Sequence, residues 1–557
     1  MGKIKETQPG AGAGFIAACI ALLLIAFFQC YKTTHDLHWA YDTDFDRDMA
    51  FIRNSLDGHF GQDPNYKGEY LWYNPLLFSI ETVIVRISGL PINTIVTQSG
   101  IYLNLLGPIF FTIMICFLFD YKIALASLLS YLFLASGNLV GTGAATFSPW
   151  LYPGCFSQFL FYLAIILSYQ AFTKQKYSWF LLLGASIGVA FLGHAAPAIL
   201  IILILISIQG ENIILSIKKK DSSSVKKYIV RGAATFISFV IVAFPFLFFI
   251  AGKYHLHIIN THIFEYHSDL LVWWNFLGLL KANFSVAFII SIIDFIWFYK
   301  NFHQPVLRKI ILNWLFISAG MLVYTILLPG IHEKLHLHLP DTVPSYHYLF
   351  YLKAIQSVFF GFGFVFLFNE AYRLAGNYIF HKAIRNTSGI PVNIVFILSV
   401  FLWAVAYFPV YKNRKDFVEL RRLSLAKEHE YNKIEVYEYI TNHIPSDKVI
   451  LCEEQFSIFP VMATSRKLVC ASILFSNPYT DFGKRYADVN SMLTFLKTKQ
   501  PASTKKLFED YHVGFALLAN KELDDGTIHS PMLGQAIFKN DMFTLYTLNR
   551  PNDMQEQ

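Results

Sequence analysis

The sequence predicts an α-helical polytopic membrane protein of about eleven spans, followed by a small C-terminal α/β domain outside the membrane. Of its 557 residues, 55% are hydrophobic and only 15% are charged, and the mean hydropathy is +0.43. A water-soluble protein of this length needs far more charge to cover its surface, so the composition favours many membrane spans. The lysines and arginines behind the net charge of +7 lie largely in short loops and in the polar tail, as membrane topology requires. The net charge therefore does not indicate nucleic-acid binding.

The first predicted span is the apolar run from about residue 14 to residue 31. This run is long enough to cross a bilayer, and no small-residue cleavage site of a signal peptide follows it. We therefore expect a retained span, with Lys3 and Lys5 on the cytoplasmic side.

Nine further apolar runs have a composition compatible with membrane spans. They lie at about 95–118, 123–140, 155–172, 178–209, 228–250, 282–299, 310–328, 346–369 and 391–411. The run at 178–209 is interpreted as two short helices of roughly 15 residues each, broken near His194.

Basic clusters predict which loops face the cytoplasm. Segments 218–227, 300–309 and 372–382 are rich in Lys, Arg and His, and such loops remain inside. This places the N-terminus inside and residues 251–281, 329–345 and everything after about 412 outside. We expect a transmembrane domain at 1–411, carrying an outer acidic loop at 32–94, and an external domain at 412–557.

Segment 72–90 is apolar enough to be mistaken for a span. Glu81 and Arg86 would then lie near the middle of the bilayer, at a cost of roughly 2.5–3.5 kcal/mol each. We therefore expect an amphipathic helix that lies on the outer surface without crossing.

The tail has the pattern of a small α/β domain. Residues 421–444 read as helices, and four short β-like runs lie between turn signals. These runs are "HIPSDKVILCEE", "RKLVCASILF", "VGFALLA" and "MFTLYTL".

The acidic loop begins with "YDTDFDRDMAF", in which every second residue is an aspartate: Asp42, Asp44, Asp46 and Asp48. A structural explanation is a capping box formed by Thr43 and Asp46, with acids in the first helical turn. That explanation fits single residues better than the group, because like charges four apart repel and Arg47 can neutralise only one of them. A carboxylate held near a low-dielectric boundary binds protons more tightly, as a general base requires.

The segment from "DFDRDMAF" to "NPLLFSIE" resembles the first external loop of GT-C superfamily glycosyltransferases. In that family an acidic residue follows the first span and opens a surface helix. A small-residue turn, an Asp-Pro-type stretch and a Pro-containing second surface helix come next. Asp44, Asp57-Gly58, Asp63-Pro64 and Asn74-Pro75-Leu76 take those places.

The resemblance implies a multi-span bundle whose active site lies on the outer face and whose donor is a sugar on polyprenyl phosphate or pyrophosphate. It also implies an aspartate acting as catalytic base in an inverting transfer. The pattern does not select uniquely among Asp42, Asp44, Asp46 and Asp48, and Asp44 is favoured because it opens the helix. In the tail, "SRKLVCASILFSNPYTDFGKRYADV" is similar to the "NP…F..R" segment of membrane arabinofuranosyltransferases, although a turn at Asn477-Pro478 before an amphipathic helix explains it equally well.

Further residues are candidates for substrate binding because they lie near the predicted outer boundary. A lipid-phosphate donor needs cationic groups at headgroup depth, and aromatic rings stack on sugars or anchor at the interface. The candidates are Lys353, His347, Lys334 and His332 for the phosphate, and Trp150, Tyr152 and Tyr73 for the sugar. His332 and His336 would share a helical face, but the chain has no HExxH motif, so no metal site is predicted and a divalent cation is kept only as an alternative cofactor.

The resulting hypothesis is an inverting glycosyltransferase of a bacterial inner membrane, although an endoplasmic reticulum enzyme would share the topology. It would move a sugar from a polyprenyl-phosphate donor to a cell-envelope glycan, lipid or protein acceptor, with membrane lipid as its surroundings. One alternative is a transporter or flippase for a lipid-linked sugar, which would favour intramembrane charges and inverted repeats. Another is a non-catalytic assembly subunit that has kept the fold.

Overall fold

The computed structural model describes residues 11–134, 146–260, 277, 284–337, 339, 343–344, 346–378, 392–497, 502–524 and 530–549. The chain divides into two compact units. The membrane unit comprises Met1–Asp36, Ser99–Ala243 and Ser268–Glu419, and the loop–tail unit comprises Leu37–Gln98, Phe244–His267 and Leu420–Gln557.

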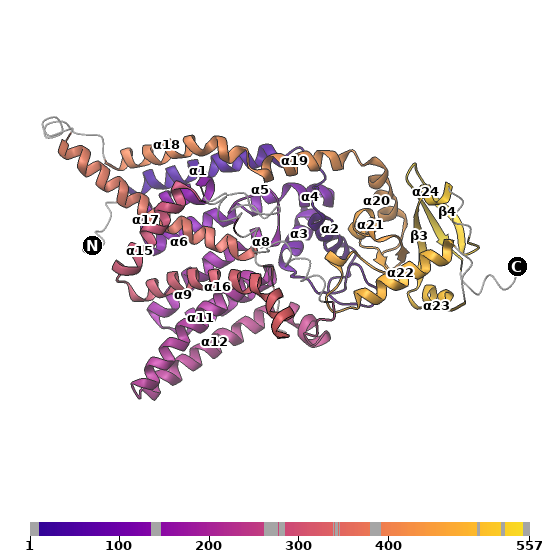
Figure 1. Cartoon of the computed structure of the whole chain (residues 1–557), viewed down its shortest axis with the longest axis horizontal. Coiled ribbons are helices and arrows are strands. Elements are labelled where there is room, and N and C mark those ends of the chain that lie inside the picture. The colour runs from indigo at the N-terminus through magenta and orange to yellow at the C-terminus, as the bar shows by residue number, and fades with distance from the viewer. Residues whose placement is uncertain are drawn as a thin grey trace. The chain divides into compact units, whose positions relative to one another are not determined.

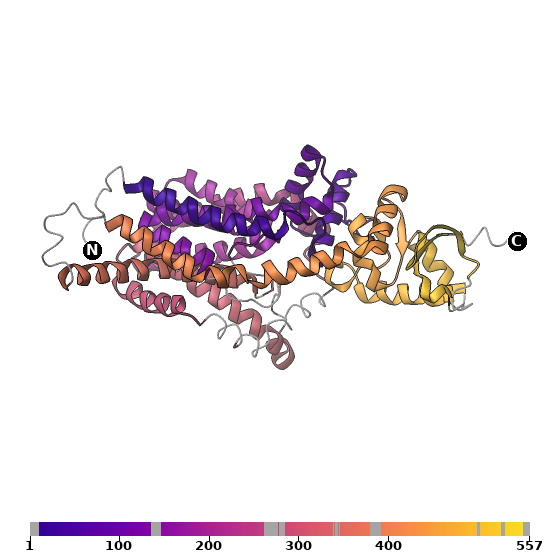
Figure 2. The same ribbon diagram turned by 90° about the horizontal axis from the view of Figure 1, so that it is seen from above.

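The membrane unit is a bundle of long apolar helices that run alongside one another (Figures 1 and 2). Within the described residues, eight helical segments are long and apolar enough to cross a membrane, which makes the chain a multi-pass membrane protein. The helices are α1 (Ala11–Thr34), α5 (Gly100–Leu103), α6 (Leu106–Leu118), α7 (Tyr121–Leu129), η1 (Ser130–Leu134), α8 (Pro153–Phe156), α9 (Gln158–Lys174), α10 (Tyr177–Gly193), α11 (Ala195–Lys218), α12 (Ser222–Leu247), α15 (Val286–Asn301), α16 (Pro305–Leu335), α17 (Tyr346–Tyr378) and α18 (Val392–Lys412).

Three shorter helices fall where the sequence predicts additional spans. They are α7 with its extension η1, α10 with 17 residues and α15 with 16 residues. The total of eleven spans therefore stays a prediction, because these helices are shorter than a bilayer normally requires.

The predicted break near His194 is confirmed, but the predicted length of the second helix is wrong. His194 separates α10 from α11, and its Nδ1 accepts a hydrogen bond from the Ala196 N–H at 3.2 Å. The second helix has 24 residues because it continues past Glu211 to Lys218. Glu211 and Lys218 are tolerated in this apolar helix because they lie toward its C-terminal end, where long side chains reach water.

Small residues bring several helices of the membrane unit together. A Cβ added at Gly184 of α10 would collide with the Thr235 carbonyl oxygen of α12, and one at Gly361 of α17 would collide with the Ser127 hydroxyl of α7. Close approach at small residues replaces the hydrophobic effect as the driving force between helices in lipid.

The loop–tail unit combines the first loop with the C-terminal domain. Its described elements are α2 (Thr43–Leu56), α3 (Leu76–Ser88), α4 (Ile92–Gln98), η2 (Phe248–Lys253), α20 (Tyr431–His443), α21 (Glu454–Phe456), η3 (Ser457–Val461), η4 (Met462–Thr464), η5 (Ile473–Phe475), α22 (Phe482–Lys497), α23 (Ala502–Asp510) and α24 (Asn520–Asp524). Helix α19 (Lys415–Glu428) begins in the membrane unit and ends in this one.

A five-stranded sheet forms the centre of the tail (Figure 1). Its strands are β1 (Val449–Leu451), β2 (Lys467–Leu468), β3 (Val513–Ala519), β4 (Leu533–Lys539) and β5 (Phe543–Leu548), in the order β2-β1-β3-β5-β4. The pairs around β1 are parallel and those around β5 are antiparallel. Four strands lie in the β-like runs predicted from sequence, and the sequence analysis missed β4.

The first loop contributes to the hydrophobic core of the tail. Ala50 of α2 and Tyr66 of the following loop are fully buried in one cluster with Val436 of α20 and Leu517 of β3. The sequence analysis placed its domain boundary at 411, whereas these contacts group residues 37–98 with the tail.

Helix α3 is too short to cross a membrane. Its 13 residues extend for about 20 Å, against roughly 30 Å for the hydrocarbon core of a bilayer. The Glu81 side chain is 1% exposed within the protein, so it avoids lipid. This agrees with the expectation that segment 72–90 does not span.

Candidate active site

The acidic helix α2 begins one residue earlier than the capping-box pattern suggests. Asp42 is the N-cap, and its Oδ1 accepts a hydrogen bond from the Asp44 N–H at 3.1 Å. The prediction of Thr43 as the cap is therefore wrong. Asp44 and Asp46 lie in the first turn, as expected, where the helix dipole favours negative charge.

Arg47 neutralises two aspartates, not the single one expected from sequence. Its Nη1 lies 2.9 Å from Asp44 Oδ1, and its Nη2 lies 2.9 Å from Asp48 Oδ1. The guanidinium also lies over the ring of Tyr73, 4.2 Å from the ring centroid. This contact brings Tyr73, one of the predicted substrate-binding residues, to the acidic cluster.

Asp46 has a separate partner from the tail. Lys427 Nζ donates to Asp46 Oδ1 at 2.8 Å and to Oδ2 at 3.0 Å. The two side chains are 2% and 6% exposed, so both carboxylate oxygens are occupied inside the protein. Nothing in the sequence pairs residues 381 positions apart, so the sequence does not predict the role of Lys427.

Burial distinguishes the carboxylates of α2. The Asp44 side chain is 34% exposed, whereas that of Asp48 is 5% exposed. Asp42 is half-buried and caps the helix. Among the three residues that form these ion pairs, Asp44 alone keeps a substantial surface for a substrate.

Burial also raises the proton affinity of the Asp44, Asp46 and Asp48 carboxylates. It raises the pKa of Asp44 above its ordinary value, although the Arg47 guanidinium opposes this rise and the Asp42 charge adds to it. Burial raises the pKa of Asp46 to about 6 against the opposing charge of Lys427, and that of Asp48 to about 7 against the opposing charge of Arg47. A carboxylate with a raised pKa accepts a proton more readily, as a general base must.

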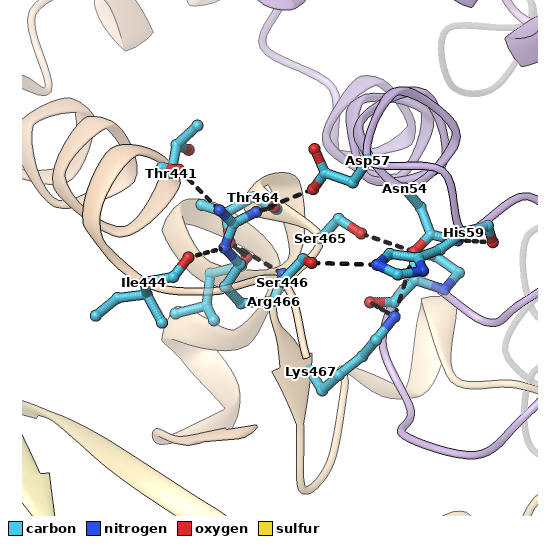
Figure 3. A network of polar contacts seen from close by, with 12 residues as sticks. Asn54, Asp57, His59, Thr441, Ile444, Ser446, Thr464, Ser465, Arg466 and Lys467 are labelled. Atoms are coloured by element: carbon cyan, nitrogen blue, oxygen red, sulfur yellow. Dashed lines mark hydrogen bonds and ion pairs between the residues drawn. The ribbon is translucent and has the colours of Figure 1, made fainter. Parts of the chain in front are cut away.

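A polar network fixes the loop after α2 to the tail (Figure 3). Arg466 donates to the carbonyl oxygens of Thr441 and Ile444 at 2.7 and 2.8 Å, and its Nη1 lies 3.5 Å from Asp57 Oδ2. Lys467 donates to the Asp63 carbonyl oxygen at 2.7 Å and to Asn54 Oδ1 at 3.3 Å. The loop geometry therefore depends on residues that follow it by about 400 positions.

The predicted turn at Asn477-Pro478 holds the same loop. Asn477 Nδ2 donates to Asp63 Oδ2 at 2.8 Å and to the Tyr254 hydroxyl at 2.9 Å. Tyr254 stacks on Tyr479, with ring centroids 4.4 Å apart. The guanidinium of Arg485 lies 4.0 Å from the centroid of the Tyr66 ring. The "NP…F..R" segment is thus a structural link between the loop and the tail.

The other predicted binding residues lie in the membrane unit. Lys353 on α17 is 4% exposed, so it is enclosed by protein and is not a surface anchor. His347 stacks on His194, with ring centroids 4.5 Å apart. Trp150 is 1% exposed and donates to the Asp416 carbonyl oxygen at 2.6 Å, and Tyr152 is 8% exposed; enclosure favours packing over sugar stacking for both residues.

The histidine face expected at the end of α16 does not form. The helix ends at Leu335, and His336 follows with a left-handed φ of 52°. His332 Nε2 instead lies 3.1 Å from the Leu339 carbonyl oxygen, and Lys334 is exposed. Within the part of the chain that the structure describes, no three His, Cys, Asp or Glu side chains are grouped closely enough to share a metal ion.

No protein-family model and no curated protein matches the sequence. Solved structures match in fold. ArnT from Cupriavidus metallidurans, bound to undecaprenyl phosphate, is 13% identical over 96% of this chain and 98% of its own, with a TM-score of 0.56. The oligosaccharyltransferase of Archaeoglobus fulgidus, tethered to an acceptor peptide, is 11% identical over 90% of this chain and 69% of its own, with a TM-score of 0.53.

The mycobacterial arabinofuranosyltransferase AftD is 11% identical over 95% of this chain and 40% of its own, with a TM-score of 0.46. This TM-score is too low to support an argument about the tail. The other two matches establish the architecture. The chain has the GT-C fold that its first loop predicts, with a helical membrane unit and a C-terminal sheet domain.

Proposed function

We propose that this protein is an inverting glycosyltransferase that uses a polyprenyl-phosphate sugar as donor and Asp44 as catalytic base. The proposal rests on one observation above all. In a fold shared with ArnT and an oligosaccharyltransferase, the helix that follows the first span leaves the Asp44 carboxylate partly exposed, while its neighbours Asp46 and Asp48 are enclosed in ion pairs.

The proposed reaction needs only one protein carboxylate. Asp44 takes the proton from the acceptor hydroxyl, and the oxygen forms a bond to the anomeric carbon of the sugar. The bond between that carbon and the phosphate oxygen breaks, and the lipid phosphate leaves with the bonding electrons. The leaving phosphate is already anionic and stable, so no general acid is required. Arg47 keeps the carboxylate in one orientation.

The donor phosphate needs cationic groups at headgroup depth, and we assign Lys353 and His347 to it. Lys353 lies near the beginning of α17, about two turns after the helix starts at Tyr346. Replacement by methionine keeps the length of the side chain and removes its charge. Lys353→Met should weaken donor binding by at least about tenfold, because charge-assisted bonds to phosphate are lost. Unchanged donor affinity would remove Lys353 from the proposed site.

The central test is turnover by purified protein in lipid nanodiscs. A panel of synthetic polyprenyl-phosphate sugars is offered with hydroxyl acceptors from glycans, lipids and peptides, and release of lipid phosphate is measured. Asp44→Asn should lower the rate by about 10²–10⁴-fold while the melting temperature stays close to that of the wild type. The anomeric configuration of the product, measured by NMR, tests inversion.

Asp447→Asn is the matched control, since this exposed tail residue undergoes the same chemical change in the same unit. It should turn over normally. Normal turnover by Asp44→Asn would refute the role of this residue. If the wild type releases no lipid phosphate from any donor, a transport or assembly role becomes the better explanation.

A further inference from the structure

A cavity in the membrane unit lies beside two loops predicted to be cytoplasmic, 218–227 and 300–309, and beside the turn between α9 and α10. Its volume is about 220 Å³, and it is lined by ends of α9, α10, α12 and α16 and by the second half of α11. The lining residues are Phe172, Gln175, Phe180, Ile208, Asn212, Tyr228, Arg231, Pro305, Val306 and Lys309. None of them belongs to the acidic cluster.

Arg231 is the charged group of this cavity. Its side chain is 8% exposed, and its two terminal nitrogens donate to Gln175, to the carbonyl oxygen at 2.9 Å and to Oε1 at 3.2 Å. The third guanidinium nitrogen, Nε, is buried without a hydrogen-bond partner. A buried N–H group without a partner is costly, and an acceptor that enters the cavity would relieve this cost.

The rest of the lining suits a lipid headgroup. Phe180 and Tyr228 flank the guanidinium, with ring centroids 5.5 and 6.0 Å from its central carbon. Phe172, Ile208 and Val306 supply an apolar wall. Lys309 adds a second cation, but Glu211 neutralises it at 2.8 Å, so the net positive charge of the cavity comes from Arg231.

We infer that this cavity binds the phosphate of a membrane lipid in the cytoplasmic leaflet. A guanidinium suits phosphate oxygens because its N–H groups are planar and its charge is permanent. Basic pockets between transmembrane helices on the cytoplasmic side are typical sites for anionic headgroups. The surrounding loops carry exposed lysines, among them Lys176, Lys218 and Lys227, which attract anionic lipid to the rim.

The inference is tested by native mass spectrometry of the full-length protein. The protein is released from mixed micelles that contain phosphatidylglycerol, phosphatidylcholine and undecaprenyl phosphate at equal concentration. We expect one anionic lipid to remain bound at least about tenfold more tightly than phosphatidylcholine. The identity of the retained lipid, phosphatidylglycerol or undecaprenyl phosphate, tells which membrane lipid supplies the phosphate. Because the proposed donor site would also hold a polyprenyl phosphate, only lipid that Arg231→Gln fails to retain is assigned to this cavity.

Arg231→Gln should abolish this preference. Arg308→Gln is the matched control, because Arg308 lies on the same turn of α16 as the lining residue Lys309 but does not line the cavity itself. Arg308 donates instead to the Tyr299 carbonyl oxygen. Since Arg231 also anchors the loop at Gln175, a second variant, Val306→Trp, fills the cavity without changing that contact. It should also lose the bound lipid.

Equal lipid retention by the wild type, Arg231→Gln and Val306→Trp would overturn the inference. The inference would also be overturned if the protein retained neither anionic lipid but bound inorganic phosphate added alone at millimolar concentration. Sugar transfer is not needed for this readout, so its result is independent of the proposed function.

Discussion

Arg47 and Lys427 decide which aspartates of the first loop are enclosed in ion pairs. The alternating aspartates are visible in the sequence, and their shared helix follows from it. The ion pairs do not, because the partner of Asp46 lies 381 residues away and the capacity of Arg47 to hold two carboxylates depends on rotamers. Sequence reasoning therefore identifies the cluster, and only the structure separates Asp44 from its neighbours.

The acidic limb of the pH–rate profile should report the charge around Asp44. A general base acts only when deprotonated, so activity falls as pH drops through its pKa, which lies above the ordinary carboxyl value because of burial. Asp42→Asn removes a nearby negative charge that contributes to this rise, while its amide oxygen still caps α2. The limb should move toward lower pH by about half a pH unit.

The control for this measurement is Asp447→Asn, which changes the net charge equally and lies exposed in the tail. Its profile should coincide with that of the wild type. A limb that stays in place in Asp42→Asn, or moves equally in both variants, would show that Asp44 does not set it.

Loss of Lys427 should destabilise the protein in a pH-dependent way. Lys427→Met leaves the Asp46 carboxylate buried without its cation, at a cost of about 3–5 kcal/mol at pH 8. The pKa of Asp46, already about 6, rises further without that cation. A raised folded-state pKa gives a contribution to stability that is present at low pH and lost as pH rises through it, so the variant should be least affected near pH 5.

Thermal melting of the detergent-solubilised protein at pH 5 and pH 8 measures this effect. The double variant Asp46→Asn/Lys427→Met should recover most of the loss at pH 8, because no buried charge remains unpaired. A single variant that melts like the wild type at pH 8 would exclude the ion pair.

Helix bounds were harder to predict than helix positions. Hydropathy located α9, α10, α11 and α16, but it ended the second helix of the 178–209 run too early, because Glu211 is polar. Glu211 pairs with Lys309 of α16, and this contact, invisible in sequence, lets α11 continue to Lys218. Strand β4 was missed because its run, "LGQAIFK", has a single β-branched residue, an isoleucine, and contains Gly and Ala, which are depleted in strands.

Helix α3 should remain on one side of the membrane. If it does not cross, the loop at Lys122 faces the cytoplasm. A single cysteine at position 122 in a cysteine-free background should therefore resist an impermeant thiol reagent in intact cells and react after permeabilisation. Lys67→Cys is the positive control, because Lys67 is exposed in the outer loop. Ready labelling of position 122 in intact cells would mean that α3 spans.

Two groups of contacts support the predicted topology. Residues 37–98, 244–267 and 420–557 form one compact unit, so the first loop, the segment after α12 and the tail lie on the same side. In the membrane unit, Gln175, Tyr228 and Pro305 line one cavity, so the basic loops 218–227 and 300–309 share a side with the turn between α9 and α10. The charge pattern of the sequence predicts both groupings, whereas the orientation across the membrane stays a prediction.

The absolute orientation can be measured with reporter fusions. Alkaline phosphatase is active only outside the cytoplasm. A fluorescent protein that is exported as an unfolded chain does not mature, so its fluorescence marks the cytoplasmic side. A phosphatase fused after the tail should be active, and the same enzyme fused at Lys220, in the loop between α11 and α12, should be inactive. The opposite pattern would invert the topology and place Asp44 inside the cell.

The link between α2 and the tail also sets an order of events during synthesis. The ribosome makes Asp46 early, and the 381 residues up to Lys427 take roughly 20–80 s to follow. During this interval Asp46 lacks its counter-charge and Ala50 lacks the core that it later joins. The first loop must therefore stay unfinished during this interval, and the acidic cluster reaches its final form only after α18 has been synthesised.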